Sequence, residues 1–443
     1  MRLLARHLSH LRQANVSLGQ LSPFSTMLTS RVLYNHIEDV ERLEFYCKGG
    51  YHPIEIGRCL RDRYRVVHKL GFGTHSTTWL AQDIQQSEYV AVKVCTADSD
   101  GKEVGILAQL TEPTAGTADC GKAMIRPVLG SYTVSGPNGT HPCFVTTPAR
   151  CSLADAKEAS RSRLFQLDVA RSLAAQLVMA VAFTHDKGYV HGDLHLGNIL
   201  LQLTSKFNHL SDQQLYEEFG FPDPEIVRRA DGKPLASGVP SHVFSPVWLG
   251  EASDKISLTE AKLVLSDFGV AFYPARESRF ESYMPLEMRP PEARFEPKTP
   301  LSFASDIWSL GCAIWAILAQ RSFLDSFLFS EDDATGDQVD ALGPLPLEWW
   351  EKWEGRSKEF MANGEPKEGR FVWSWDQRFE DSIQQPRRET GMGALDEEEG
   401  DAFSEMVRSM LSFKTRDRPN ARQVLNSSWM KNWAIPAYEK SRG

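Results

Sequence analysis

The stretch of sequence that decides the fold is Tyr189-Val190-His191-Gly192-Asp193-Leu194-His195-Leu196-Gly197-Asn198-Ile199-Leu200-Leu201. An apolar approach leads into a tight turn that carries Asp193, and Asn198 follows just before a short apolar strand. At this spacing a carboxylate can orient a hydroxyl group while an amide oxygen holds a magnesium ion, as phosphoryl transfer from ATP requires. One such spacing can arise by chance, so the interpretation depends on companion motifs on both sides.

A glycine turn between two apolar runs lies upstream, within residues 63–81. The alternation of apolar residues on both sides of the turn predicts a hairpin of two strands. Gly71 and Gly73 leave room for the backbone to close over a phosphate group, and Ser76 stands where a third glycine is expected. A G-x-G pattern alone is a weak signal, because glycine is common in turns.

A lysine inside an apolar strand follows, in Tyr89-Val90-Ala91-Val92-Lys93-Val94. A buried ammonium group is costly without an anionic partner. ATP phosphates would be one partner, and Glu103, at the start of a helical-looking segment, would be the second. The alternative, without any role in nucleotide binding, is that Lys93 lies along an edge strand and extends its charged end into water.

A second carboxylate motif lies downstream, where the apolar strand at residues 262–269 ends in Asp-Phe-Gly. Its aspartate, Asp267, would hold magnesium between the ATP phosphates. Residues 270–288 would then form the loop that receives a substrate, and a Pro-Pro-Glu motif ending at Glu292 closes it. We expect Arg418 to pair with Glu292, since a lone buried charge needs a partner.

The remaining segments are read from their periodicity and composition. Residues 164–187 predict a long amphipathic helix with a glycine signal at its end. The most apolar run, at 307–319, is too short to span a bilayer, so we expect a buried helix and no transmembrane segment. Residues 204–261 predict a spacer insert with one helix near 211–219, which we interpret as a disordered surface segment, with a docking element as the alternative. The tryptophan-rich region at 337–385 is typical of core packing.

Composition narrows the function classes. The chain has 443 residues, 42% of them hydrophobic and 24% charged, which is ordinary for one large two-lobed domain or two to three smaller ones. A net charge of −9 argues against nucleic acid as the main ligand and permits a basic protein partner, for which Asp337 and Asp340 are candidate contacts. The acidic run at 396–399 predicts a solvated face. The seven cysteines form no C-x-x-C pair, so we expect neither a disulfide framework nor a zinc site.

The first 37 residues contain no Asp or Glu and four arginines, at positions 2, 6, 12 and 31. This composition is typical of a mitochondrial transit peptide, and a disordered leader is the alternative.

With these motifs in order, residues 60–435 resemble the eukaryotic protein kinases, most closely the SR-protein kinase branch and its fungal relatives. The branch is indicated by Gly-Tyr-His-Pro-Ile-Glu-Ile-Gly at 50–57, by the glycine loop and the residues after it at 71–80, and by the spacer. The resemblance implies an α+β, two-lobed protein kinase fold with a small β-rich N-lobe and a larger helical C-lobe. It also implies ATP and Mg²⁺ as cofactors, and a basic Arg/Ser-rich protein as substrate, phosphorylated on serine.

The resemblance assigns roles by position. Lys93 would contact the α- and β-phosphates with Glu103 as its ion-pair partner, and Asp193 would be the base. Asn198 and Asp267 would bind magnesium. The expected nucleotide contacts are Gly71, Phe72, Gly73, Thr74, His75, Ser76, Ala91, Lys93, Thr147, Ala149, Asn198 and Asp267.

Three positions depart from the family pattern. Gly192 replaces the arginine that pairs with a phosphorylated activation loop, which suggests a loop that needs no phosphate there. His195 replaces a catalytic lysine at the γ-phosphate, and a neutral imidazole lacks a fixed charge. Thr78 replaces the valine over adenine. The resulting loop, H-G-D-x-H-x-x-N, also resembles that of choline and aminoglycoside kinases, so a small-molecule kinase and an inactive pseudokinase are the rival readings.

The expected organisation runs from the leader (1–37) and an N-terminal extension (38–62) to the N-lobe (63–147), the C-lobe with its insert (148–435, about 204–261) and a tail (436–443). By resemblance the protein works inside the cell, in the cytoplasm or nucleus, with mitochondrial targeting as the alternative. We expect no direct binding of nucleic acid, and the oligomeric state stays open.

Overall fold

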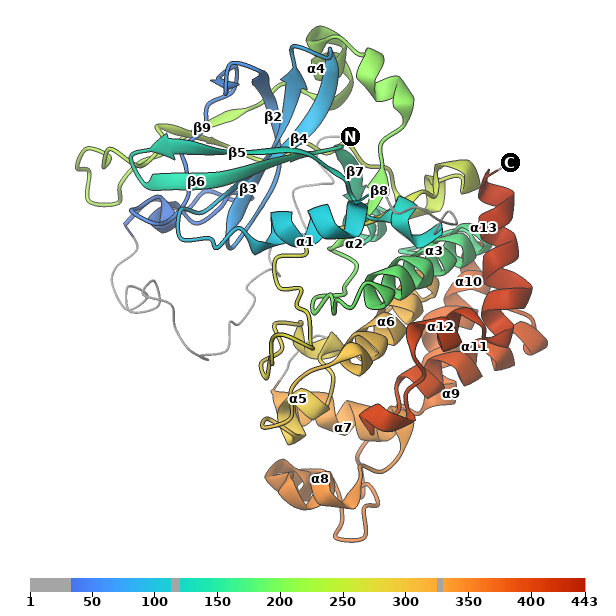
Figure 1. Cartoon of the computed structure of the whole chain (residues 1–443). Coiled ribbons are helices and arrows are strands. Elements are labelled where there is room, and N and C mark those ends of the chain that lie inside the picture. Colours follow the sequence, from blue (N-terminus) through green and yellow to red (C-terminus); the bar gives the residue numbers. More distant parts are fainter. Residues whose placement is uncertain (1–32, 113–119, 325–329, 443) are drawn as a thin grey trace. The chain divides into compact units, whose positions relative to one another are not determined.

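The computed structural model describes residues 33–112, 120–324 and 330–442, which form two compact units (Figure 1). Unit 1 comprises Met1–Gly101, Val128–Pro148 and Ser205–Trp248, and unit 2 comprises Lys102–Pro127, Ala149–Thr204 and Leu249–Gly443. Unit 1 is rich in strands and unit 2 in helices, as the predicted fold class requires.

Unit 1 is built on a six-stranded antiparallel sheet with the order β1-β2-β3-β4-β6-β5. Its apolar face is a core of valines and aromatic residues, among them the buried Val66, Trp79 and Val92. The predicted hairpin is present as β2 and β3, and Gly73 faces Ser76 across the turn. The elements of unit 1 are β1 (Cys59–Leu60), β2 (Tyr64–Gly73), β3 (Ser76–Asp83), β4 (Glu88–Cys95), β5 (Val128–Gly136), β6 (Gly139–Thr146), α4 (Asp212–Phe219), β9 (Pro224–Ile226) and β10 (His242–Phe244).

A second apolar cluster in unit 1 joins the N-terminal extension to the predicted insert. Tyr34 forms an isolated bridge with Arg229, and β9 pairs with β10. The buried members are Tyr34, Leu43, Tyr46, Tyr51, Val227, Val239 and Val243. The prediction of an unstructured spacer is therefore wrong for residues 205–248, because their apolar side chains find partners far earlier in the chain. The predicted helix within the spacer is confirmed as α4.

Unit 2 holds most of the helices and a small sheet with the order β11-β8-β7. Its strands are β7 (Ala149–Ser152), β8 (Ile199–Gln202) and β11 (Leu263–Leu265). Its helices are α1 (Lys102–Thr111), α2 (Leu153–Glu158), α3 (Leu167–Asp186), α5 (Glu292–Phe295), α6 (Phe303–Leu318), α7 (Glu331–Leu342), α8 (Leu347–Lys352), α9 (Trp375–Phe379), α10 (Gln385–Thr390), α11 (Glu397–Met410), α12 (Ala421–Leu425) and α13 (Ile435–Arg442).

The two most apolar helices, α3 and α6, pack together in the core of unit 2. Both confirm predictions, and α3 ends before Gly188, whose φ of +85° is the left-handed geometry of a glycine cap. By length and composition α3 is the one described helix that could cross a membrane, but 78% of its apolar window is buried inside the protein. It is therefore explained as a core helix.

The boundaries differ from the predicted lobes in three places, and one of them is the segment at 205–248, which was expected in the C-lobe but groups with unit 1. Helix α1, expected in the N-lobe at 63–147, groups with unit 2. The expected tail at 436–443 is helix up to Arg442, because α13 packs on α3. The predicted leader falls almost entirely on residues 1–32, outside the described residues.

Two buried carboxylates of unit 2 are paired with arginines. Arg418 forms a two-pronged contact with Glu292, at 2.8 and 2.7 Å, which confirms the predicted pair. The predicted solvated face at 396–399 is wrong for Glu399, which is fully buried and bound by Arg171. Trp349 and Trp353 lie in a core cluster, so the packing interpretation of the tryptophans is confirmed.

Candidate active site

The stretch that opened the analysis forms a loop of unit 2 between α3 and β8. The amide nitrogen of Asn198, Nδ2, donates to Asp193 twice, to the carboxylate oxygen Oδ2 at 2.9 Å and to the backbone oxygen at 3.0 Å. This fixes the orientation of the Asp193 carboxylate. It also commits the amide nitrogen of Asn198, so that its carbonyl oxygen Oδ1 is the atom that remains for a cation.

The start of the loop is held by the N-terminal end of α6. The Asp306 carboxylate accepts hydrogen bonds from the backbone N–H groups of His191 and Gly192, at 2.7 and 2.9 Å, and a contact of 2.9 Å joins it to His185. Gly192 has φ +78°, a left-handed conformation that costs a glycine little and strains other residues. The sequence singled out the α6 segment but not this role of Asp306.

His195 lies beside the predicted base. The backbone N–H of Gly197 donates to its Nδ1 at 3.1 Å, so in the neutral ring the proton is on Nε2. That Nε2 atom lies 3.5 Å from Oδ2 of Asp193. The neutral histidine thus presents an N–H group, where the family pattern has a lysine, toward the same carboxylate that Asn198 orients.

Asp267 follows β11, which pairs with β8 directly after Asn198. The backbone N–H of Ser266 and its hydroxyl both donate to the backbone carbonyl oxygen of Asn198, at 3.0 and 2.9 Å, so the two motifs are joined. Asp267 has φ +61°, which is uncommon outside glycine. Strain of this kind is maintained where a side chain must point in a particular direction.

Unit 2 also carries Glu103, near the start of α1, and an arginine that sequence reasoning missed. Ile125, next to Arg126, forms a bridge with Leu265 at the end of β11. Nε and Nη2 of Arg126 are buried without a hydrogen-bond partner. Burial lowers the pKa of Arg126 to about 10, while the charges of Glu103 and Asp267 oppose that shift. A cation therefore stands near both predicted acidic residues. No motif signals it, since Arg126 precedes a proline in an irregular segment.

Unit 1 contains the glycine loop and Lys93. Lys93 lies in β4, where it pairs with Thr78 on one side and Phe144 on the other, and its ammonium is 5.7 Å from the Phe144 ring centre. Ala91, on the same strand, is buried and pairs with Thr146. The tip of the loop is exposed.

The predicted contacts are divided between the two units. Unit 1 holds Gly71, Phe72, Gly73, Thr74, His75, Ser76, Ala91, Lys93 and Thr147, and unit 2 holds Glu103, Ala149, Asp193, His195, Asn198 and Asp267. Within unit 2 the structure brings Asp193, His195 and Asn198 together. The ion pair between Lys93 and Glu103 would join the units and stays a prediction.

The donor set suits a magnesium ion bound together with a nucleotide. Mg²⁺ prefers oxygen ligands and is commonly held by one or two protein groups plus substrate phosphates. The Asn198 amide oxygen and the Asp267 carboxylate fit this pattern. Among the described residues no group of three or more His, Cys, Asp or Glu could hold a metal on its own, so phosphate oxygens would have to complete the site.

The segment predicted to receive a substrate, 270–288, is held by Arg279 within it and by Arg289 directly after it. Arg279 donates to the carbonyl of Val270 and lies 4.8 Å from the Phe272 ring centre, while Arg289 donates to the carbonyl of Met284 at 3.2 Å.

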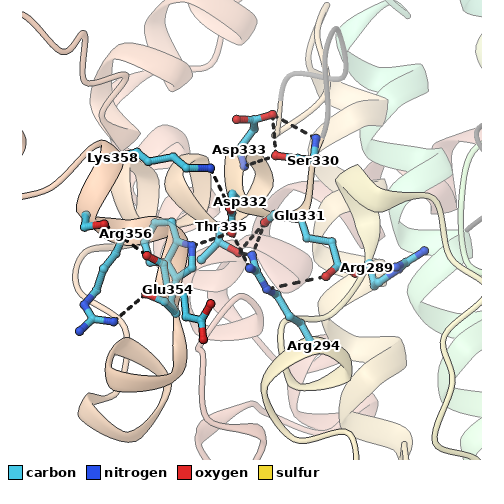
Figure 2. Close-up of polar contacts among 12 residues, drawn as sticks. Arg289, Arg294, Ser330, Glu331, Asp332, Asp333, Thr335, Glu354, Arg356 and Lys358 are labelled. Atoms are coloured by element: carbon cyan, nitrogen blue, oxygen red, sulfur yellow. Dashed lines mark hydrogen bonds and ion pairs between the residues drawn. The ribbon is translucent and has the colours of Figure 1, made fainter.

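The acidic residues proposed to contact a basic segment are already paired. Asp340 binds Arg370 at 2.5 Å, and Asp337 lies 3.4 Å from Arg378, so a basic segment would compete with these arginines, and the two contacts stay a prediction. The first turn of α7 shows the same behaviour (Figure 2). There Asp332 binds Arg294 at 2.6 Å, and Glu331 lies 3.4 Å from Arg289.

Comparisons with known proteins indicate the class of protein that the chain resembles. The model of the protein kinase domain matches residues 64–220. A serine/threonine protein kinase of Aspergillus fumigatus is 27% identical over 427 residues, which cover 92% of this chain and 95% of the relative. The serine/threonine-protein kinase SRPK of Physarum polycephalum is 25% identical over 406 residues (88% and 91%), and human SRSF protein kinase 3 is 29% identical over 231 residues (50% and 40%).

A solved kinase-domain structure matches with a TM-score of 0.57 and 17% identity, over 85% of this chain and 98% of that one, which shows the fold alone. These matches identify the class of protein that the chain resembles: residues 64–220 match the protein kinase domain, and the chain has the protein kinase fold. Within that class it is similar to the SR-protein kinases and to a fungal serine/threonine kinase, as the sequence motifs predicted. Members of this class use ATP and Mg²⁺.

Proposed function

We propose that this protein kinase transfers the γ-phosphoryl group of ATP to serine or threonine hydroxyls, with serines of basic Arg/Ser-rich proteins as its substrates. The observation that carries the catalytic part is the arrangement of Asp193, His195 and Asn198 on one loop of unit 2. The names of the relatives support the acceptor residue and the substrate class.

In the proposed reaction Asp193 orients the acceptor hydroxyl. As the hydroxyl oxygen bonds to the γ-phosphorus and the bond to the bridging oxygen of ADP breaks, Asp193 accepts the hydroxyl proton. Magnesium, when bound, neutralises charge on the phosphate oxygens, and Asn198 and Asp267 would hold it. The N–H on Nε2 of His195 helps to fix the position of the Asp193 carboxylate. Lys93, with Glu103 as the proposed partner, would hold the α- and β-phosphates.

The test is phosphate transfer from labelled ATP to an Arg/Ser-repeat peptide, beside the same peptide with lysine in place of arginine. Asp193→Asn and Asp267→Ala are expected to lower the rate by about a hundredfold or more, since each removes a charge that acts on the transition state. Asp401→Asn, which changes an exposed aspartate on α11, is the matched control and should leave the rate unchanged.

Each failure has its own meaning. Near-normal turnover by Asp193→Asn would refute the assignment of Asp193 as the base. Equal rates on the arginine and lysine peptides would refute the preference for Arg/Ser substrates but not the kinase activity itself. Transfer to choline or an aminoglycoside in place of any peptide would establish the small-molecule alternative, and nucleotide binding without turnover would establish the pseudokinase.

We also propose that the protein works in the cytoplasm or nucleus. A full-length chain with a C-terminal fluorescent tag tests this, since mitochondrial fluorescence would favour the transit-peptide interpretation of residues 1–37.

A further inference from the structure

The tip of the glycine loop in unit 1 is bound by a residue of the N-terminal extension. The phenolic oxygen of Tyr51 lies 2.8 Å from the carbonyl oxygen of Gly73 and 3.1 Å from that of Thr74. A phenol has one hydrogen to donate, so the two carbonyls share it. These carbonyls belong to the turn where β2 becomes β3.

Tyr51 is itself firmly positioned. Its side chain is buried, and its ring packs against Tyr46, with 5.5 Å between the ring centres. Its backbone N–H donates to the Phe45 carbonyl at 2.9 Å, and its own carbonyl accepts from Nδ2 of Asn138 at 2.8 Å. Burial, together with the charge of Glu41, raises the pKa of the Tyr51 phenol, so the hydroxyl keeps its proton.

The same part of the extension also holds the base of the loop. Lys69, just before the first glycine, is completely buried and paired with the buried Glu41. Glu41 additionally accepts a hydrogen bond from the Tyr46 hydroxyl. Breaking a buried pair of this kind leaves an uncompensated charge, so the contact is a strong restraint on geometry. The backbone carbonyl of Lys69 accepts a hydrogen bond from the N–H of Val247, which lies in the segment that had been predicted as a spacer.

We propose that residues 41–51 form a clamp that holds the glycine loop in place before any nucleotide arrives, with Tyr51 as the positioning residue for the phosphate end of ATP. A glycine-rich turn loses much conformational freedom when it closes on a ligand. Two tip carbonyls bound to a rigid phenol remove part of that loss in advance. The effect on nucleotide rests on the proposed function, whereas the effect on the loop does not.

Tyr51→Phe tests the clamp because it deletes the hydroxyl and keeps the ring in the core. Tyr132→Phe is the matched control, since the Tyr132 hydroxyl is buried in the same unit and has no hydrogen-bond partner. In nucleotide-free protein, hydrogen exchange of the amides at 72–77 should become severalfold to about tenfold faster in Tyr51→Phe, the range expected for one lost hydrogen bond. It should stay unchanged in Tyr132→Phe.

Calorimetry with Mg²⁺-ADP and with adenosine then tests the positioning role. We expect the affinity of Tyr51→Phe for ADP to fall and its KM for ATP to rise by a similar factor, with a smaller change in kcat. The affinity for adenosine should not change, because adenosine has no phosphate.

Exchange rates equal to those of Tyr132→Phe would overturn the clamp, and faster exchange with unchanged ADP affinity would overturn the positioning role. A wild-type protein that transfers no phosphate would refute the proposed function alone, since the exchange experiment is independent of turnover.

Discussion

His52, beside the clamp residue Tyr51, is a buried histidine with an unusual environment. Neither ring nitrogen has a hydrogen-bond partner, and its ring centre lies 4.8 Å from that of His141. Burial, with the charges of His141 and Arg58, lowers the pKa of His52 to about 4.

This predicts an acid-sensitive unit 1. Between about pH 6.5 and pH 4 the unfolded chain holds a proton on this residue and the folded chain does not, so acidification favours unfolding. The stability is fully present above about pH 6.5, and we expect the free energy of unfolding to fall by up to about 3 kcal/mol toward pH 4. Urea unfolding of unit 1 at several pH values measures this.

His52→Gln should flatten the dependence in this window, whatever its own stability at neutral pH. The control is His209→Gln, at an exposed position. An unchanged slope in His52→Gln would show that His52 does not cause the acid sensitivity.

At the scale of single residues, the sequence predicted the parts of the site that follow a spaced motif. Asp193, Asn198 and Asp267 were found because their chemistry needs a fixed order along the chain. Arg126 and Tyr51 could not be assigned roles, because those roles depend on contacts with residues distant in sequence. The same reason explains Glu399, whose acidic neighbours suggested solvent while its actual partner is Arg171.

At the scale of elements, the N-terminal end of α6 is what fixes the catalytic loop. Because both carboxylate oxygens of Asp306 accept backbone N–H groups, Asp306→Asn would turn an amide NH₂ toward a donor. We expect a loss of about 1–3 kcal/mol in the stability of unit 2, as for an unsatisfied buried group. We also expect a drop in kcat of tenfold or more, because the loop that carries Asp193 shifts. Denaturation and steady-state kinetics measure the two effects.

Asp396→Asn is the companion variant. Asp396 accepts the N–H of Glu399 at the start of α11, and asparagine caps a helix about as well as aspartate. If Asp306→Asn behaves like Asp396→Asn, the anchoring role is wrong.

The elements that periodicity predicted are those with a strong apolar pattern, namely the β2–β3 hairpin, α3 and α6. The segment at 205–248 was missed because its strands are very short and its apolar residues are widely spaced. Its order comes from Tyr34, Leu43 and their neighbours in the extension, which local patterns cannot reveal.

At the scale of the whole molecule, each unit has a core of its own and contains a buried ion pair: Lys69 with Glu41 in unit 1, and Arg418 with Glu292 in unit 2. Because separate cores can unfold separately, we expect the two units to unfold at different urea concentrations. Hydrogen exchange measured for individual peptides at each urea concentration separates the two transitions. Lys69→Met should shift the transition of unit 1 and Arg418→Met that of unit 2, each by about 3–5 kcal/mol.

The two variants serve as controls for each other. A single transition that both variants shift equally would show that the units unfold as one cooperative body. The division into a β-rich and a helical part was predictable from the order of motifs, whereas the assignment of α1 and of 205–248 to their units was not, since it depends on packing.

The self-held segment at 270–288 has a consequence for control of the protein. Arg279 and the adjacent Arg289 bind its backbone carbonyls, and Gly192 occupies the position at which the family pattern has an arginine that pairs with a phosphate. If the proposed function holds, we expect a catalyst that is competent as soon as it has folded, without phosphorylation by a second enzyme. The rate of phosphorylation in a cell would then depend on how fast the protein is made and degraded and on how often it meets its substrate.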